Sequence, residues 1–324
     1  MTEGWAGPTW GEPSTALSGP PPLRPLATSA SASYRAEGGR SEDFLVLGAC
    51  VAGTSHRLAR RRCEDCYAWV QPGQRRLALL VADGVGSAGR GGEGAELALD
   101  AACEHLAQVP QAQSAATGGL LAPDVAAGTP VGPATFGWGE AECAAAIAAA
   151  SQALTSSAGP SARELATTIV VALVQLDAMG GHGTGPDARA QVALGRVGDS
   201  SAFVLSPDGS WRELFTAGGS TPAAEEAERL IGAATAVLPV ACPPGPIEFS
   251  TAQLSAGEAL VLVSDGVAEP LRDGPKTVAP RLAEVLERAR SGKLGPLELA
   301  TALDFSRRGA HDDRTVLVAW AIGC

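Results

Sequence analysis

Acidic side chains at the ends of strand-like segments are the residues whose types and spacing suggest chemistry. Two segments share one design, an apolar run that ends in Asp-Gly-Val: LLVADGVGS with Asp83, and VLVSDGVAE with Asp265. A buried strand holds its last residue rigidly, and the glycine after it permits a tight turn and a close backbone approach. Each segment predicts a carboxylate fixed at a strand end, although a single Asp-Gly pair is also an ordinary turn.

Two acidic pairs extend this pattern. Glu64-Asp65 precedes the apolar segment CYAWV, and Asp312-Asp313 precedes TVLVAW. Adjacent acids repel one another unless a cation compensates. Hard divalent cations prefer oxygen ligands, and a site with two such ions generates hydroxide at neutral pH and stabilises an in-line displacement. The four histidines are scattered along the chain, which argues against zinc.

Short strands and amphipathic helices must position these acids. The pattern of β-branched and apolar residues predicts strands over 43–53, 66–71, 76–83, 167–176, 190–198, 201–206, 259–265 and 314–322. Helical spacing or alanine content predicts helices over 93–109, 140–154, 278–290 and 296–308. Runs of strands come between pairs of helices, which favours stacked antiparallel sheets flanked by helices over a doubly wound parallel sheet.

The chain divides into a tail and one folded domain. Residues 1–40 are rich in Pro, Ser, Gly and Ala without apolar periodicity, so we expect a disordered N-terminal tail. Residues 41–324 carry the strand and helix patterns and are expected to fold as one domain. A Gly/Pro/Ala-rich, nearly uncharged stretch at about 110–138 is predicted to be a low-complexity insertion in that domain.

Composition excludes several classes of function. Hydrophobic residues make up 45% of the 324 and aromatic residues only 4%, so the core must be aliphatic. A net charge of -11 disfavours binding to nucleic acid or anionic lipid. The sequence has no apolar stretch long enough to span a membrane and no secretory signal, which predicts a cytoplasmic protein. The seven cysteines lack a regular framework and are expected to be mostly reduced thiols.

Taken together, these motifs resemble the type 2C (PPM) metal-dependent protein serine/threonine phosphatases of the bacterial type. The matching elements occur in the family's order over about 45–322: Arg60 with Glu64-Asp65, Asp83-Gly84, A-T-T-I-V-V-A-L from Ala166, V-G-D-S at 197–200, S-D-G at 264–266, and D-D-R-T-V at 312–316. The resemblance implies an α+β fold, a four-layer α-β-β-α sandwich with two central, mainly antiparallel sheets flanked by helices.

The resemblance also implies roles for individual residues. Two Mn²⁺ or Mg²⁺ ions would share Asp83; Glu64 and the Gly84 carbonyl would complete one metal shell, and Asp265 and Asp312 would hold the other ion. A water bridging the metals would attack phosphorus directly, without a covalent phosphoenzyme.

Two further roles concern neighbouring residues. Arg60 would bind phosphate oxygens, a task that suits its planar guanidinium. Asp313 stands where the family usually has Asn, so we expect Asp313→Asn to be nearly neutral.

Three positions depart from the family pattern. Val85 stands where some relatives have a histidine, a candidate general acid, and Ser201 replaces the arginine that usually follows V-G-D-S. Only Glu164 is found where an aspartate for a third metal is expected. These departures concern third-metal binding and substrate contacts, whereas the residues expected for two metals are present.

The implied activity is hydrolysis of phosphoserine and phosphothreonine in phosphorylated proteins, in opposition to a Ser/Thr kinase, by a protein expected to be a monomer. Two alternatives stay open: a catalytically silent relative that binds phosphoproteins or regulatory partners, and a phosphatase of small phosphomonoesters. Cys63 and Cys66 are interpreted as ordinary cysteines or, alternatively, as an oxidisable pair beside the proposed metal acids.

Overall fold

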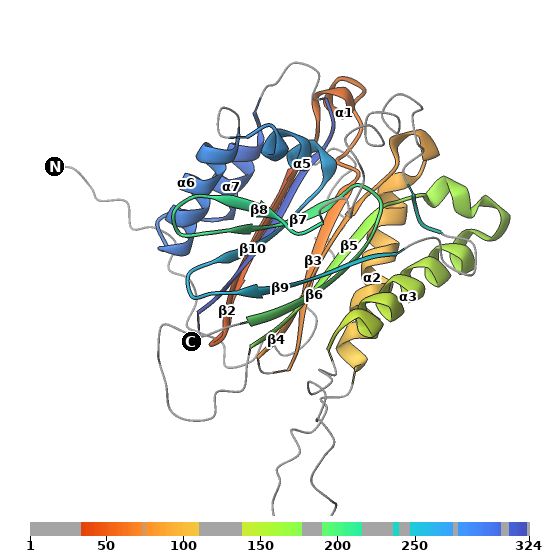
Figure 1. The fold of residues 1–324 in the computed structure, drawn as a ribbon. Helices are drawn as coiled ribbons and strands as arrows, with labels where there is room; N and C mark the ends of the chain where they lie inside the picture. Colours follow the sequence, from red (N-terminus) through yellow and green to blue (C-terminus); the bar gives the residue numbers. More distant parts are fainter. Residues whose placement is uncertain are drawn as a thin grey trace, which may run out of the picture.

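The structure of the protein is a computed structural model that describes residues 34–73, 75–109, 138–176, 190–215, 236–239, 247–274, 278–305 and 311–322. The described strands form two sheets, one of six strands and one of five, and every strand pair within them is antiparallel. Figure 1 shows the two sheets face to face, with helices on their outer sides.

The six-stranded sheet has the order β1-β2-β11-β10-β7-β8. Its strands are β1 (Tyr34–Arg40), β2 (Phe44–Val51), β11 (Arg314–Ala321), β10 (Ala259–Val263), β7 (Ser201–Leu205) and β8 (Trp211–Glu213). β2, β7 and β10 are buried along their whole length, because one face meets the other sheet and the opposite face meets helices. Burial on both faces explains why their sequences are nearly continuous apolar runs.

The five-stranded sheet has the order β3-β4-β5-β6-β9. Its strands are β3 (Asp65–Gly73), β4 (Arg76–Asp83), β5 (Ile169–Leu176), β6 (Ala190–Val197) and β9 (Glu248–Leu254). β3 and β4 pair in a register that sets Asp65 directly opposite Asp83, so two of the predicted acids meet at one end of this sheet.

Helices cover the outer faces. The longer helices on the five-stranded sheet are α2 (Gly91–Gln108) and α3 (Glu140–Ala158). The six-stranded sheet carries α5 (Asp265–Arg272), α6 (Ala279–Arg290) and α7 (Pro296–Leu303). Short helical segments are α1 (Thr54–Leu58), η1 (Gly86–Ala88) and η2 (Gly159–Leu165).

Three apolar layers hold the four structural layers together. The first lies between the sheets and includes Phe44, Tyr67 and Leu79. The second lies between the five-stranded sheet and α2 and α3, and the third between the six-stranded sheet and α5, α6 and α7. The α+β fold expected from the sequence, a four-layer α-β-β-α sandwich with two central antiparallel sheets, is confirmed.

The predicted helices and strands all fall on observed elements, apart from small shifts of their ends. The sequence analysis did not predict four elements: β1, α1, β9 and α5. The predicted insertion at about 110–138 lies outside the described residues except for Trp138, which is buried.

β1 corrects the predicted boundary of the N-terminal tail. Residues 34–40, assigned above to a disordered segment, form an edge strand that pairs with β2 along its whole length. The Arg35 guanidinium stacks on the Tyr67 ring of the other sheet, with its carbon 4.5 Å from the ring centre. β1 escaped notice because its sequence, YRAEGGR, has no apolar alternation and its partner strand determines its structure.

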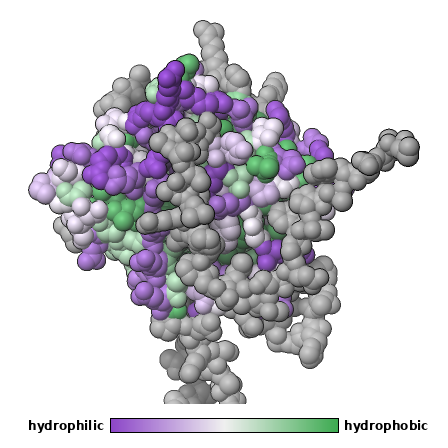
Figure 2. Space-filling view, turned by 180° about the vertical axis from the view of Figure 1, so that it is seen from behind, coloured by the Kyte–Doolittle hydropathy of each residue, from purple (hydrophilic) through white to green (hydrophobic). Residues whose placement is uncertain are grey.

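The described part of the surface carries few large apolar side chains. Figure 2 shows a face on which hydrophilic residues surround smaller apolar areas. Among the residues that the structure describes, the exposed large apolar ones come from four different elements: Tyr34, Leu58, Phe249 and Leu297. No helix within the described ranges is long and apolar enough to cross a membrane.

Two truncations test the role of β1. Removal of residues 1–33 is expected to leave the thermal midpoint nearly unchanged, because that segment has no core-forming pattern. Removal of residues 1–40 also deletes the ladder with β2 and uncovers Tyr67, so the midpoint should fall by several degrees or more, as about 1 kcal/mol shifts a domain of this size by about 2–4 °C. Differential scanning calorimetry of both variants measures this, and equal midpoints would contradict a structural role for β1.

Candidate metal centre

The predicted acids come together at one end of the two sheets. In Figure 1 this is the upper end, where α1 and the start of α5 lie. Glu64 and Asp65 stand at the entry to β3, Asp83 ends β4 and Asp265 begins α5 directly after β10. Asp312 and Asp313 precede β11. Asp199, in the turn between β6 and β7, belongs to the same cluster, although sequence analysis gave it no role.

The backbone of Asp83 is fixed by two threonines of the A-T-T segment. Its carbonyl accepts hydrogen bonds from the Thr168 backbone N–H at 2.8 Å and from the Thr167 hydroxyl at 2.9 Å. Its own N–H donates to the Thr168 hydroxyl at 3.3 Å. The carboxylate therefore projects from a backbone that cannot move freely, as expected for a strand-end acid.

Gly84, directly after Asp83, allows the start of α2 to pass close to the end of β4. A Cβ atom at this position would lie 2.4 Å from the Gly91 carbonyl carbon and 2.6 Å from the Gly92 nitrogen, both at the start of α2. Any side chain would push α2 away from the strand end. This is the close backbone approach that the Asp-Gly motif predicts.

Neighbouring carboxylates raise each other's pKa values. Burial is the largest cause of the raised pKa of Asp83, followed by the charges of Asp65, Asp265, Asp312 and Asp199. The pKa of Asp265 is raised to about 7, again chiefly by burial and then by Asp312 and Asp199. The cluster therefore lacks enough positive charge from its own side chains to balance its acids.

Asp65 is more deeply buried than Glu64, at 4% exposure against 7%. One carboxylate oxygen accepts a hydrogen bond from the Thr315 hydroxyl at 2.7 Å. Burial raises the pKa of Asp65, and the charge of Asp313 raises it further. Asp65 is thus a constrained acid directly across the strand pair from Asp83.

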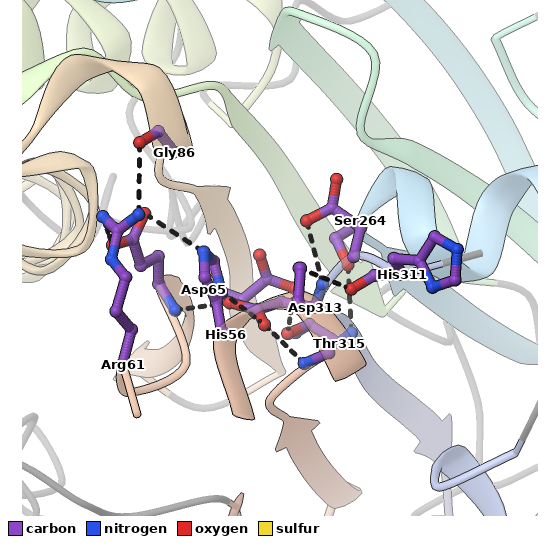
Figure 3. Close-up of polar contacts among 12 residues, drawn as sticks. His56, Arg61, Asp65, Gly86, Ser264, His311, Asp313 and Thr315 are labelled. Carbon is purple, nitrogen blue, oxygen red and sulfur yellow. Dashed lines mark hydrogen bonds and ion pairs between the residues drawn. The ribbon is translucent and has the colours of Figure 1, made fainter. Parts of the chain in front are cut away.

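Glu64 has a different environment because the Arg61 guanidinium faces it. Burial raises its pKa, whereas Arg61 and His56 lower it and Asp313 raises it. The Arg61 guanidinium pairs with Oε1 of Glu64 and also donates to the Gly86 carbonyl at 3.4 Å. Figure 3 shows Arg61 reaching Gly86 beside His56 and Asp65.

The donor set fits a hard divalent cation. Buried carboxylate oxygens without a hydrogen-bond partner occur on three members of the cluster: Glu64 Oε2, Asp65 Oδ1 and Asp265 Oδ1. Such oxygens are costly unless a cation or water satisfies them. Within the described residues, no three His, Cys, Asp or Glu side chains already converge as metal ligands.

Arg60 is exposed and has a positive φ of 55° in the loop between α1 and β3. Among the described residues, the structure records no hydrogen bond or ion pair of its side chain, whereas Arg61 pairs with Glu64 and Arg62 with Glu96. Of the three arginines at 60–62, Arg60 is therefore the one whose guanidinium is available to bind a ligand. Its predicted role in phosphate binding stays a prediction.

The departures from the family pattern have structural counterparts. The Ser201 hydroxyl donates to Glu213 at 2.5 Å, and Glu213 pairs with Arg272, so an arginine from α5 lies beside the position that usually carries one. Glu164 is exposed, and its described contact is a backbone one, from the Arg90 N–H to its carbonyl at 3.0 Å.

Cys63 and Cys66 are free thiols in the structure. A hydrogen bond with Cys50 and burial raise the pKa of Cys63, and burial raises the pKa of Cys66. Both effects favour the thiol over the reactive thiolate. The surroundings therefore favour the interpretation of ordinary cysteines.

Comparisons with known proteins agree with this arrangement. A family model described as Protein phosphatase 2C matches residues 52–304. Serine/threonine-protein phosphatase 3 of Escherichia coli (strain K12) is 39% identical over 72 residues, which cover 21% of this chain and 28% of that protein. The match thus spans less than a third of the curated relative.

Solved structures share the fold. The S. agalactiae serine/threonine phosphatase superposes with a TM-score of 0.52 at 14% identity, covering 86% of this chain and 100% of that chain. A bacterial serine phosphatase gives a TM-score of 0.53 at 16% identity, covering 86% of this chain and 97% of that chain.

The pKa of Asp265 predicts how the stability of the metal-free protein depends on pH. An unfolded aspartate releases its proton near pH 3.8, whereas folded Asp265 holds it up to about 7. The stabilisation is present below the lower value and is lost as the pH rises through the upper one. In the presence of a chelator, Asp265→Asn should remove this loss and stabilise the protein by about 1 kcal/mol or more at about pH 8.

Urea denaturation at about pH 5 and about pH 8 measures this difference. Glu104→Gln, an exposed carboxylate change on α2, is the matched control and should leave the pH dependence as in the unmodified protein. If the stability of Asp265→Asn depends on pH in the same way as that of the control, Asp265 is not the source of the stability loss at high pH.

Proposed function

The chain belongs to the protein phosphatase 2C family, and we propose that it is a metal-dependent phosphatase that hydrolyses phosphoserine and phosphothreonine in proteins. The observation that carries the proposal is the acidic cluster, which gathers carboxylates from separate strand ends and leaves several of their buried oxygens without partners. The name of the E. coli relative, a serine/threonine-protein phosphatase, supports the substrate class.

Under this proposal the cluster holds two Mn²⁺ or Mg²⁺ ions. Asp83 would be shared by both, with Glu64 and the Gly84 carbonyl on one side and Asp265 and Asp312 on the other. When bound, such ions supply an activated water at neutral pH for direct attack on phosphorus and neutralise phosphate charge. The fixed backbone of Asp83 and the raised pKa values of Asp83 and Asp265 support these assignments, because a nearby cation would relieve the repulsion.

The protein's own groups then bind and orient the substrate. Arg60 would hold the phosphate oxygens through its exposed guanidinium. The substrates would be phosphorylated proteins, and the opposing enzyme would be a Ser/Thr kinase. The cytoplasmic location and the monomeric state predicted from the sequence belong to the same proposal.

Metal dependence is the first test. Hydrolysis of an aryl phosphate, and then of a phosphothreonine peptide, should require Mn²⁺ or Mg²⁺ and stop with excess EDTA, because the carboxylates alone supply no nucleophile at neutral pH. Asp83→Asn should reduce the turnover rate by orders of magnitude, since that carboxylate is assigned to both ions.

Three other outcomes would point elsewhere. Full activity in excess EDTA would contradict a metal-dependent mechanism. Hydrolysis of the aryl phosphate without the peptide would favour small phosphomonoesters as substrates. No hydrolysis of either, with intact phosphopeptide binding, would indicate a silent binding protein.

The arginine run offers a matched pair of variants. Arg60→Ala should raise KM for the phosphopeptide by about tenfold, the cost of one charge-assisted contact, and leave the Mn²⁺ dependence unchanged. Arg62→Ala, an exposed arginine paired with Glu96, should leave both unchanged. Steady-state kinetics across a Mn²⁺ titration measures the two effects. A raised KM for Arg62→Ala but not for Arg60→Ala would reassign the phosphate-binding position.

A further inference from the structure

Asp313 is the most enclosed carboxylate at this end of the molecule, with 1% exposure, and its contacts differ from those of a metal ligand. One oxygen, Oδ1, accepts hydrogen bonds from the Gly53 N–H at 2.6 Å and from His56 Nδ1 at 2.8 Å. The other, Oδ2, accepts from the Glu64 N–H at 2.6 Å. Both oxygens are therefore engaged by the protein itself. We refer to this carboxylate and its donors Gly53, His56 and Glu64 as the Asp313 bridge.

The Asp313 bridge joins distant parts of the sequence. Gly53 and His56 lie at α1, Glu64 at the entry to β3 and Asp313 at the entry to β11. Further contacts fasten α1 to the same segment: the Ser55 hydroxyl donates to the His311 carbonyl at 2.7 Å, and the Thr54 hydroxyl contacts His311 Nδ1 at 2.9 Å. α1 is thus held against the segment that leads into β11 at both His311 and Asp313.

The bridge fixes the orientation of His56. An ionised carboxylate only accepts hydrogen bonds, so Nδ1 of His56 carries the proton that it donates to Asp313. The ring is 8% exposed, and its other nitrogen, Nε2, lies 3.8 Å from Oε2 of Glu64. Figure 3 shows His56, Asp313 and Arg61 gathered around this part of the cluster.

Glu64 is held through both its backbone and its side chain. Its backbone N–H is bound to Asp313, and Oε1 of its side chain is bound to Arg61, whereas Oε2 has no hydrogen-bond partner. A carboxylate presented to a cation needs such supports, since partners beyond the ligands fix the direction of the ligand and tune its affinity for the metal.

We propose that His56 is a positioning residue for the metal centre, acting through Asp313: its Nδ1–H holds the Asp313 carboxylate in the orientation that fixes the backbone of Glu64. The proposal rests on the role of Glu64 proposed above. It assigns His56 no contact with metal or substrate. It also revises the expectation for Asp313→Asn, because an amide presents an NH₂ group to one of the two backbone N–H donors and cannot accept from both.

Three substitutions of His56 separate positioning from other roles. His56→Asn keeps a donor close to the Nδ1 position, His56→Leu has a similar shape without the donor, and His56→Gln moves the amide toward the Nε2 position. His105→Asn, the same chemical change on α2, is the control. Two readouts are measured on the full chain: Mn²⁺ affinity by calorimetry, and hydrogen exchange of the Gly53 and Glu64 amides by NMR in EDTA.

The proposal expects near-normal Mn²⁺ affinity and amide protection in His56→Asn and His105→Asn. It expects about tenfold weaker Mn²⁺ binding and faster exchange of both amides in His56→Leu and His56→Gln. Asp313→Asn removes one acceptor directly, so at least one of the Gly53 and Glu64 amides should exchange as fast as in His56→Leu. If His56→Leu does not fold, His56→Gln carries the comparison.

Two results would overturn the proposal. Equal loss of Mn²⁺ affinity in His56→Asn and His56→Leu, with amide protection intact, would show that Nε2 acts directly. Normal affinity and protection in His56→Leu would show that the ring merely fills space. The exchange measurement needs no metal, so absence of Mn²⁺ binding to the unmodified protein would refute the proposed function and still leave the bridge open to test.

Discussion

Repulsion between carboxylates is the constraint on which the rest of this structure depends. Asp65 and Asp83 face each other directly across a strand pair, a placement that like charges normally disfavour. The charges of Asp265, Asp312 and Asp199 add to it and raise the pKa of Asp83. A flexible scaffold would let these groups separate into solvent. Here the three apolar layers hold both sheets in place, so the acids stay together with their charge unbalanced.

Glycines at the strand ends allow backbone segments to approach one another closely, and these contacts set the positions of the acids. A Cβ atom at Gly266 would lie 2.1 Å from the Asp313 carbonyl oxygen, and one at Gly53 would lie 2.2 Å from the His311 carbonyl oxygen. Together with the crossing at Gly84, these contacts bring the starts of α1, α2 and α5 up against the strand ends. The glycines therefore determine how closely the acidic residues approach one another. The charges of the carboxylates then determine how strongly these residues repel.

Local signals in the sequence predict much of this arrangement. The apolar runs of β4 and β10 and the glycines after Asp83 and Asp265 are all contiguous patterns, so the strand-end acids could be found from them. β9 was missed because its sequence, EFSTAQL, is that of a half-exposed strand, and α5 because it contains Pro270, a residue that usually ends helices. The role of Asp313 could not be found either, since its donors lie 249 to 260 positions away.

The position of β11 has a consequence for how the protein is made. This strand lies between β2 and β10, although it follows β2 by most of the length of the chain. Until residues 314–321 leave the ribosome, β2 has no neighbour on that side and the six-stranded sheet exists as two unconnected parts. Such non-local pairing makes folding slow. A nascent chain therefore carries an incomplete acidic cluster until the segment with Asp312 and Asp313, which leads into β11, has been added.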